Sequence, residues 1–452
     1  MKMRDQKKML IRTETLVVTA LALMAFSLST KAQTLGEVYS VARQSDPRFL
    51  ALRSEFEASG FSVTEARAAL FPQVSVGINR TNTNQNILQS ANPVFAKGAA
   101  TYPTNDRTLS ISQPIFRLGS WRNWKQSQAS ERQAAAAYAA AEQDLIVRTA
   151  SAYMAVLAAQ DVLKFSRSEY ESIKRQLELA DAKFKSGQAI RVNLFDAQAR
   201  NALKQSDVIA AENDLADKKQ ALREITGMDV KELAPLANEL PTLLPQPMSA
   251  DQWVQTSLER NLLLEARTQA VDVALKEVDK NRAGHYPTAD LVVSRNQRVT
   301  GGSLFGGGSS VNTNDVTFRV NIPLYEGGST TAAVGRADAK YRTAQQDLER
   351  DRRLVDRQAR LAYAGVVSGV TRAAALEQSV QALDGARKLK EESFKAGVST
   401  VLGVLDAERD LFAVRRDAAQ SRYDYQLNLL RLKQAAGTLS ESDLTLIRTV
   451  AP

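Results

Sequence analysis

The sequence predicts a mainly α-helical chain with a small β part, arranged as two tandem repeats. Three observations support this fold class. Apolar residues recur every seven positions over long stretches, a few short segments alternate apolar and polar residues, and several motifs occur twice about 210 residues apart. The seven-residue period indicates helices packed side by side, whereas the two-residue alternation indicates strands with one apolar face.

The first 32 residues have the composition of a secretory signal peptide. A basic stretch precedes the mostly apolar segment LVVTALALMAFSL (16–28), and small residues follow it. A helix that spans a bilayer needs roughly 20 apolar residues, so this segment is too short for one. We expect cleavage between Ala32 and Gln33, with a membrane anchor as the alternative, and therefore an exported mature chain.

The composition excludes several kinds of chemistry. There is no cysteine and only one histidine, His285, so disulfides, thiol catalysis, cysteine-ligated zinc and a lipid-modified N-terminal cysteine are ruled out. No nucleophile–base set or nucleotide-binding loop is visible, so we expect no enzyme, no cofactor and no metal site. The net charge of +9 lies partly in the signal peptide, and no basic run is interleaved with aromatic residues. Nucleic acid is therefore not an expected partner.

The repeats divide the mature chain into two similar halves. The paired motifs are ISQPIF and VNIPLY, FKSGQAIRVNLFDAQ and FKAGVSTVLGVLDAE, and ITGMD and AAGTL, in the same order in both halves. Prolines cluster between the halves, where helix cannot continue. We predict a first repeat over 33–234, a proline-rich linker over 235–249 and a second repeat over 250–452.

Each repeat has the order helix, strand, polar loop, strand, very long helix, turn and long helix. The expected strands lie near 72–80, 107–116, 287–296 and 315–325. The expected long helices cover 119–185, 192–226, 328–395 and 401–436. At ~1.5 Å per residue the longest would extend about 100 Å, far beyond an ordinary globular core. Such helices must build a rod, a bundle or a tube.

The predicted strands have one apolar and one polar face, and there are only four of them. In DVTFRVNI, the apolar residues Val316, Phe318 and Val320 alternate with Thr317 and Arg319. In an exported chain without a long apolar helix, such strands point to a barrel in an outer membrane, because backbone groups in lipid must all be paired. Known barrels need about eight strands or more, so four cannot close. Either the strands form a soluble sheet, or several chains share one barrel.

Aromatic residues where strands meet helices favour the shared barrel. They would form a belt at the membrane surface, although each alone could be ordinary packing. The expected belt comprises Phe116, Trp121, Trp124, Tyr286 and Tyr325.

The architecture and motifs resemble the TolC-like outer-membrane channels, a family of efflux and type I secretion proteins. The most specific stretch is FKAGVSTVLGVLDAERDLFAVRRDAAQSRYDYQLNLLRLKQAAGTLSESDL near the C-terminus. The resemblance implies a homotrimer, with a 12-strand β-barrel in the outer membrane and an α-helical barrel in the periplasm. It also implies a periplasmic adaptor protein and an inner-membrane pump of the ABC or RND type as partners.

The resemblance places two functional regions at the helix–turn–helix points. The turns would contact the adaptor, or could be merely tight turns; they comprise Lys185, Ser186, Gly187, Gln188, Lys395, Ala396, Gly397 and Val398. A gate would close the tunnel near these turns, and Asp406 matches one of its acidic positions; the alternative is a residue at a helix start. The chain departs from the family pattern at Asn193, Phe394, Ser399 and Gly403, so the charged latch must be weaker or built differently.

Three functions remain open on the sequence alone. The first is a passive exit duct for type I protein secretion, which the C-terminal motif and the missing N-terminal cysteine favour. The second is the outer-membrane part of a small-molecule or multidrug efflux pump. The third, from another class, is a periplasmic coiled-coil adaptor, although adaptors need an anchor and usually have one hairpin.

Overall fold

The computed structural model describes residues 32–89, 98–188, 190–229, 232–236, 244–302 and 307–447. The expected signal peptide, apart from Ala32, and part of the linker lie outside these residues. The chain forms two compact units: unit 1 takes residues up to Leu50, Ala141–Asn261 and the chain from Val355, and unit 2 takes Ala51–Ala140 and Leu262–Leu354. Each unit therefore combines segments from both sequence repeats.

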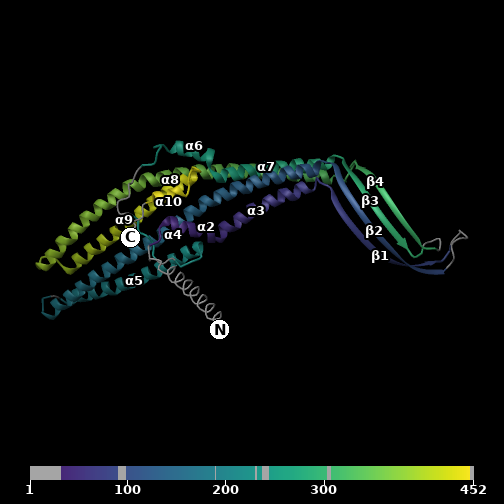
Figure 1. Cartoon of the computed structure of the whole chain (residues 1–452). Coiled ribbons are helices and arrows are strands. Elements are labelled where there is room, and N and C mark those ends of the chain that lie inside the picture. The colour runs from purple at the N-terminus through teal and green to yellow at the C-terminus, as the bar shows by residue number, and fades with distance from the viewer. Residues whose placement is uncertain are drawn as a thin grey trace, which may run out of the picture. The chain divides into compact units, whose positions relative to one another are not determined.

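The described residues are mainly helical, as expected (Figure 1). The helices are α2 (Leu35–Ser45), α3 (Pro47–Ala68), α4 (Leu118–Lys185), α5 (Arg191–Thr226), α6 (Ala250–Arg260), α7 (Leu262–Arg282), the short 3-10 turn η1 (Ala283–His285), α8 (Ser329–Lys395), α9 (Val401–Ala435) and α10 (Ser442–Leu446). The strands are β1 (Gln73–Ile87), β2 (Gly98–Arg117), β3 (Thr288–Thr300) and β4 (Ser309–Asn321). Among the described residues, no helix is apolar over a stretch that could cross a membrane.

The seven-residue track identifies the packed side of α9. Val404, Leu411, Tyr425 and Leu432 lie on this track and are all buried. Tyr425 and Leu432 pack against Ala362 and Val366 of α8, in the part of α8 that belongs to unit 1. Helix pairing along a heptad seam therefore forms the core here, as the period predicted.

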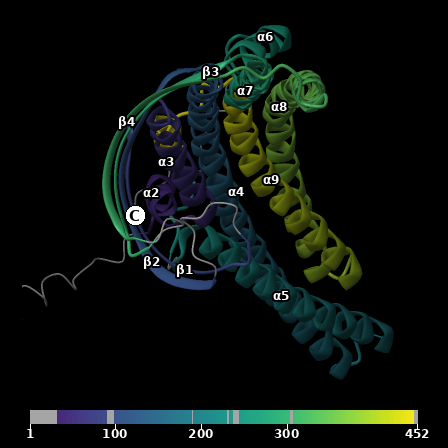
Figure 2. The ribbon, with the colours of Figure 1, turned by 90° about the vertical axis from the view of Figure 1, so that its right-hand side faces the viewer.

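Two helical hairpins form most of unit 1, α4 with α5 and α8 with α9 (Figure 2). Gly187 and Gly397 end the first helix of each hairpin with positive φ angles of 75° and 78°. Their amide groups donate to the carbonyl oxygens of Phe184 and Phe394 at 3.0 and 3.1 Å, respectively. A left-handed residue at a helix end favours glycine, which explains the FKSG and FKAG motifs.

The strands of unit 2 form one antiparallel sheet in the order β1-β2-β3-β4 (Figure 1). Because the order follows the sequence, β1 and β4 are the two edges of this four-stranded sheet. Within the described part of the chain, each edge leaves a row of backbone groups without a strand partner. A single chain therefore carries an open sheet, which matches the expectation that one copy cannot close a barrel.

The strands are longer than the sequence predicted. The segments 81–87 and 98–106, expected within a polar loop, pair as strands from Thr81 with Thr104 to Ile87 with Gly98. β3 and β4 likewise remain paired as far as Thr300 with Ser309. These ends are mostly polar, and the few apolar residues in them, such as Val299 and Val311, form no clear two-residue period, so backbone hydrogen bonds define them instead. At the other end, β4 stops at Asn321, before Tyr325.

The register places apolar side chains of all four strands on one face. Val74, Ile111, Val293 and Val316 form a single cross-strand row, because each lies directly opposite the next. All four are exposed, Val316 by 75%. The neighbouring row, on the opposite face, comprises Gln73, Ser112, Val292 and Thr317. The sheet therefore has one exposed apolar face and one mostly polar face, as the alternation predicted.

Candidate functional site

An ion pair joins α5 to α9 at the expected gate residue. A guanidinium nitrogen of Arg200 donates to Oδ1 of Asp406 at 2.9 Å, and Arg409 lies 3.5 Å from the same oxygen. The Asp406 side chain is 36% exposed, so its carboxylate reaches solvent while it holds both cations. Arg200 was not predicted from the sequence, because 206 residues separate it from Asp406.

The other predicted gate residues lie closer to the turns. Asn193, Phe394 and Ser399 line one small pocket in unit 1, together with the turn residues Gln188 and Gly397. Asp406 and Gly403 do not line this pocket. Three of the five predicted gate residues therefore line a pocket near the turns, whereas Asp406 forms an ion pair further along α9.

Lysine and phenylalanine hold the two hairpins together beside this pocket. Lys183 of α4 places its ammonium 4.0 Å from the centre of the Phe394 ring and contacts the Phe394 carbonyl oxygen at 3.5 Å. Phe394 is buried with Ile173, Val401 and Leu405. A cation over an aromatic face is attracted by the ring electrons. Phe394 therefore connects α4 to α8 and α9.

The turn residues expected to contact an adaptor are exposed at the ends of the two hairpins. Lys185 pairs with Asp181 at 2.7 Å and Lys395 pairs with Glu391 at 2.8 Å, each within its own helix. Val398 is an apolar side chain exposed at a turn. Both hairpins thus present a short polar turn with a lysine, and the second adds an apolar residue.

A buried glutamate links three helices, and sequence reasoning missed it. Glu169 of α4 is 1% exposed and pairs with Lys204 of α5 at 3.0 Å and with Arg416 of α9 at 3.4 Å. Two cations around one buried carboxylate compensate its charge. Only its position among apolar residues of the α4 heptads could have suggested burial, and its two partners could not be identified from the sequence.

Glu408 of α9 is a second buried carboxyl group. It is 1% exposed, and Ser172 Oγ donates to its Oε1. Its Oε2 has no hydrogen-bond partner within the part of the chain that the structure describes. Burial raises the pKa of Glu408, and the charge of Glu391 raises it further, whereas Ser172, Arg387 and Arg175 lower it. The protonated form is therefore favoured relative to an exposed glutamate.

Glu408→Gln is expected to stabilise the protein near neutral pH by about 1–3 kcal/mol, because an unpaired neutral amide costs less to bury than an unpaired charged carboxylate oxygen. A carboxyl group whose folded pKa is raised loses stability as pH rises from its ordinary value of 4.5 through the raised value. Glutamine keeps the bond with Ser172 without a charge. Thermal unfolding between pH 4 and pH 8 should therefore be less pH-dependent in the variant.

Glu277→Gln is the matched control for this prediction, because Glu277 lies in unit 2 and is not one of the charges that shift the pKa of Glu408. Burial raises the pKa of Glu277, but hydrogen bonds from Lys280, Asn281 and Gln126 outweigh burial and lower it, so its charge is favourable in the folded protein. The control should be no more stable than the parent near neutral pH. A Glu408→Gln variant that is less stable than the parent at pH 8 would contradict the cost assigned to this buried charge.

The predicted belt aromatics lie in unit 2, at the ends of the strands. Phe116 is near the end of β2, Tyr286 precedes β3, and Tyr325 follows β4; all three are exposed. Trp121 and Trp124, in the first turns of α4, contact each other edge to face with ring centres 5.0 Å apart. These positions mark the places where the sheet passes into helices.

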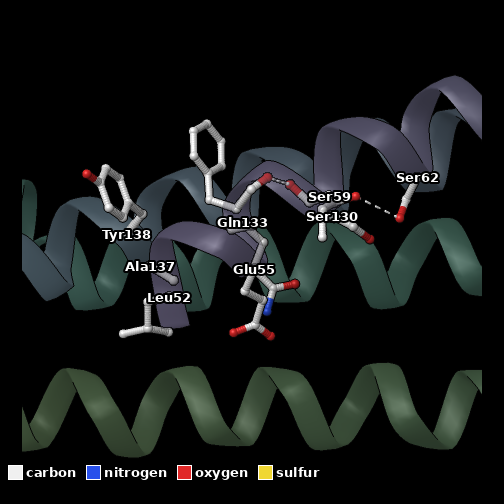
Figure 3. A pocket seen from close by; sticks show the side chains of 11 residues that line it. Leu52, Glu55, Ser59, Ser62, Ser130, Gln133, Ala137 and Tyr138 are labelled. Carbon is white, nitrogen blue, oxygen red and sulfur yellow. Dashed lines mark hydrogen bonds between the residues drawn. The ribbon is translucent and has the colours of Figure 1, made fainter. Parts of the chain in front are cut away.

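A groove between α3 and α4 of unit 2 is lined by small and polar side chains together with Leu52, Phe56 and Tyr138 (Figure 3). The hydroxyls of Ser59 and Ser62 donate to carbonyl oxygens of their own helix, at 2.6 and 3.1 Å. Phe56 stacks on Tyr138 with ring centres 5.7 Å apart. The hydroxyl hydrogens of both serines are therefore used within α3. We interpret the groove as a contact between helices and not as a ligand site. Among the described residues, no group of three acidic or histidine side chains could hold a metal ion.

Comparisons with known proteins agree with this architecture. Residues 38–228 and 253–438 match the outer membrane efflux protein family. The chain is 33% identical to the outer membrane protein TolC of Vibrio cholerae, over 94% of this chain and 95% of that protein. It is 30% identical to the alkaline protease secretion protein AprF of Pseudomonas aeruginosa, over 90% of this chain and 85% of that protein.

A solved structure shares the fold at low sequence identity. The outer membrane channel CmeC of Campylobacter jejuni superposes with a TM-score of 0.77 at 15% identity, covering 90% of this chain and 86% of that chain. The expected fold class is thus confirmed, and it is that of a protomer of a trimeric channel with a shared β-barrel and a helical barrel. This chain belongs to the outer membrane efflux protein family and lies in the outer membrane, extending into the periplasm.

Proposed function

We propose that three copies of this chain form a passive exit duct for type I protein secretion. Because the proposed duct is passive, an inner-membrane pump of the ABC type supplies the energy. A periplasmic adaptor connects the pump to the two helical turns. Export then requires only that the duct opens.

The open four-stranded sheet is the observation that carries this proposal. Its exposed apolar row suits a lipid-facing surface, and its polar row suits a water-filled interior. Because both edges are unpaired, copies must join β4 of one to β1 of the next. A secretion role is supported by the similarity to AprF, an alkaline protease secretion protein, which extends over 90% of this chain.

Small-molecule efflux is the second candidate, because the family that this chain matches is that of outer membrane efflux proteins. Deleting the gene in the native host separates the two functions. Loss of specific proteins from the culture medium, restored by the wild-type gene, supports secretion. Increased sensitivity to drugs and detergents with unchanged secreted proteins supports efflux. If the deletion alters neither, the proposed export role is wrong.

The pair Arg200–Asp406 forms part of the proposed gate. In a trimer, Asp406 occurs three times around the axis, and three carboxylates would attract cations to the duct. Arg200 at 2.9 Å neutralises each carboxylate and ties α5 to α9. This pair takes the place of the latch residues that are missing at Asn193, Ser399 and Gly403.

Asp406→Ala and Arg200→Ala are expected to change the conductance in opposite directions. Without Asp406, block by divalent cations in planar bilayers should weaken, by about tenfold if each cation loses about 1.4 kcal/mol. Without Arg200, the carboxylate is less neutralised, so block should strengthen and the open state should be more frequent. Single-channel recording with divalent cations added on the periplasmic side measures both effects.

Asp410→Ala is the control, because Asp410 is one turn away and pairs with Arg409 at 2.9 Å. Its block should equal that of the parent. Unchanged block in Asp406→Ala would remove Asp406 from the gate. Equal block in Arg200→Ala and the parent would show that the pair does not control the charge of the duct.

A further inference from the structure

An apolar pocket lies where β2 passes into α4. Its volume is about 380 Å³, within the range of small-molecule sites. The register of β2 with β3 shifts between Pro114 and Phe116, so Ile115 is an extra, unpaired residue in the strand. This bulge directs additional apolar surface into the pocket, whose other lining residues include Leu70, Phe116 and Trp121.

The pocket continues the apolar face of the sheet. Phe116 lies opposite Ala289, which is opposite Val320, and this row lies on the same face as the row of Val316. Ile115 and Phe116 are both exposed. A surface that is continuous with the lipid-facing side of the sheet is accessible to lipid chains from the membrane.

Two cations lie over aromatic rings that line the pocket or follow a lining residue in the sequence. The ammonium of Lys125 is 5.4 Å from the ring centre of Trp121, which lines the pocket. The guanidinium of Arg67 is 5.5 Å from the ring centre of Phe71, next to Leu70. Within the described residues, neither cation forms an ion pair, whereas Arg117 and Arg122 nearby are held by Asp290 at 2.8 Å and Asp279 at 3.3 Å.

The order of these groups along the chain matches the order of groups in one leaflet of a membrane. Apolar rows of the sheet come first, then Phe116 and Trp121, and then Lys125 one turn later. Acyl chains, the interface and the phosphates follow one another in the same order. We propose that the pocket of each chain binds one glycerophospholipid, with an acyl chain against Ile115 and Trp121 and the phosphate between Arg67 and Lys125.

The apolar and cationic parts together point to a phospholipid rather than to free phosphate. A free anion would need only the cations, which are solvated and hold it weakly. A neutral lipid would need only the apolar surface. Because the site has both an apolar and a cationic part, we predict that binding requires both the acyl chains and the phosphate of the lipid. The inference rests on the outer-membrane location and not on the cargo, because it concerns the purified channel alone.

Native mass spectrometry of the purified trimer measures this binding directly. With added palmitoyl-oleoyl phosphatidylglycerol, we expect up to three lipids per trimer, and weaker binding of the diacylglycerol with the same chains. Glycerol phosphate without chains should not compete. Each cation near a membrane surface contributes roughly fivefold, so Arg67→Ala with Lys125→Ala should weaken binding about 25-fold. Lys125→Arg should retain it.

Lys340→Ala is the matched control, because it removes one exposed cation of unit 2 elsewhere on α8. It should bind lipid as the parent does, and the trimer mass in the same spectra shows that each variant is assembled. Equal binding in the parent and the double variant would overturn the proposal. Equal affinity for the diacylglycerol, or retention of detergent in place of lipid, would also overturn it. A photoactivatable acyl chain that does not cross-link to the pocket would overturn it as well, because a second copy of the chain would then cover the pocket.

Discussion

Val316→Arg is expected to abolish assembly of the channel in the outer membrane. Val316 is at the end of the cross-strand row Val74, Ile111, Val293 and Val316 and is 75% exposed on the apolar face. An arginine on the lipid face of a barrel costs about 2–4 kcal/mol near the middle of the bilayer. Three copies multiply this to about 6–12 kcal/mol per trimer.

The edge position of β4 adds to this effect. β4 pairs with β3 on one side only, so its other side must pair with another copy to close the barrel. A guanidinium at this junction opposes both lipid contact and strand pairing. Cell fractionation and semi-native gel electrophoresis should show loss of the trimer from the outer-membrane fraction.

Thr317→Arg is the matched control on the same strand. Thr317 lies opposite Val292, in the polar row with Ser112 and Gln73, so its side chain points to the other face. Arginine there should remain solvated, and the trimer should form at nearly the parent level. If both variants assemble equally well, the assignment of the apolar face to lipid is wrong.

The four long helices could be located from the sequence because both local and periodic signals mark them. Gly187 and Gly397 follow the ends of α4 and α8, and a seven-residue apolar period runs through both helices. The strands were located correctly, but they extend further than predicted at the ends near Thr81 and Thr300, and β4 ends before the predicted Tyr325. Polar side chains predominate near Thr81 and Thr300, with Val299 as an exception, and backbone pairing extends the sheet there.

The proposed gate could be only partly predicted, since a sequence shows which face of a helix is packed but not the register between helices. The resemblance pointed to Asp406, whereas its ion-pair partner Arg200 depends on how α5 lies against α9. Glu169 with Lys204, and Glu408 with Ser172, were missed for the same reason. A charged residue within a heptad is normally expected to face solvent. Glu169 and Glu408 are buried because further helices pack against their own helices.

Asp46→Ala is expected to destabilise unit 1 by about 3–5 kcal/mol, the usual effect of breaking a buried ion pair from one side. The Asp46 side chain is 3% exposed and accepts two hydrogen bonds from the Arg148 guanidinium, at 2.9 and 3.1 Å. It also accepts from the Phe49 amide at 2.7 Å, which caps α3 directly before Pro47.

The titration of Asp46 follows from the same contacts. Burial alone would raise its pKa, but the hydrogen bonds from Arg148 and Phe49 outweigh burial and hold the pKa below its usual value. A carboxyl group with a lowered folded pKa contributes stability above its unfolded pKa and loses it as pH falls. The destabilisation by Asp46→Ala should therefore be greatest at pH 7 and become smaller as pH falls below the ordinary pKa of 3.8.

Two variants separate the ion pair from the helix cap. Asp144→Ala removes the other partner of Arg148, but this carboxylate is 40% exposed, so the loss should stay below about 1 kcal/mol. Asp46→Asn keeps a capping oxygen for the Phe49 amide and removes only the charge, so its stability should lie between the parent and Asp46→Ala. Thermal midpoints of the detergent-solubilised trimer give this order. If Asp144→Ala were as damaging as Asp46→Ala, the exposed side of Arg148 would matter as much as the buried one, and burial would not be the source of the effect.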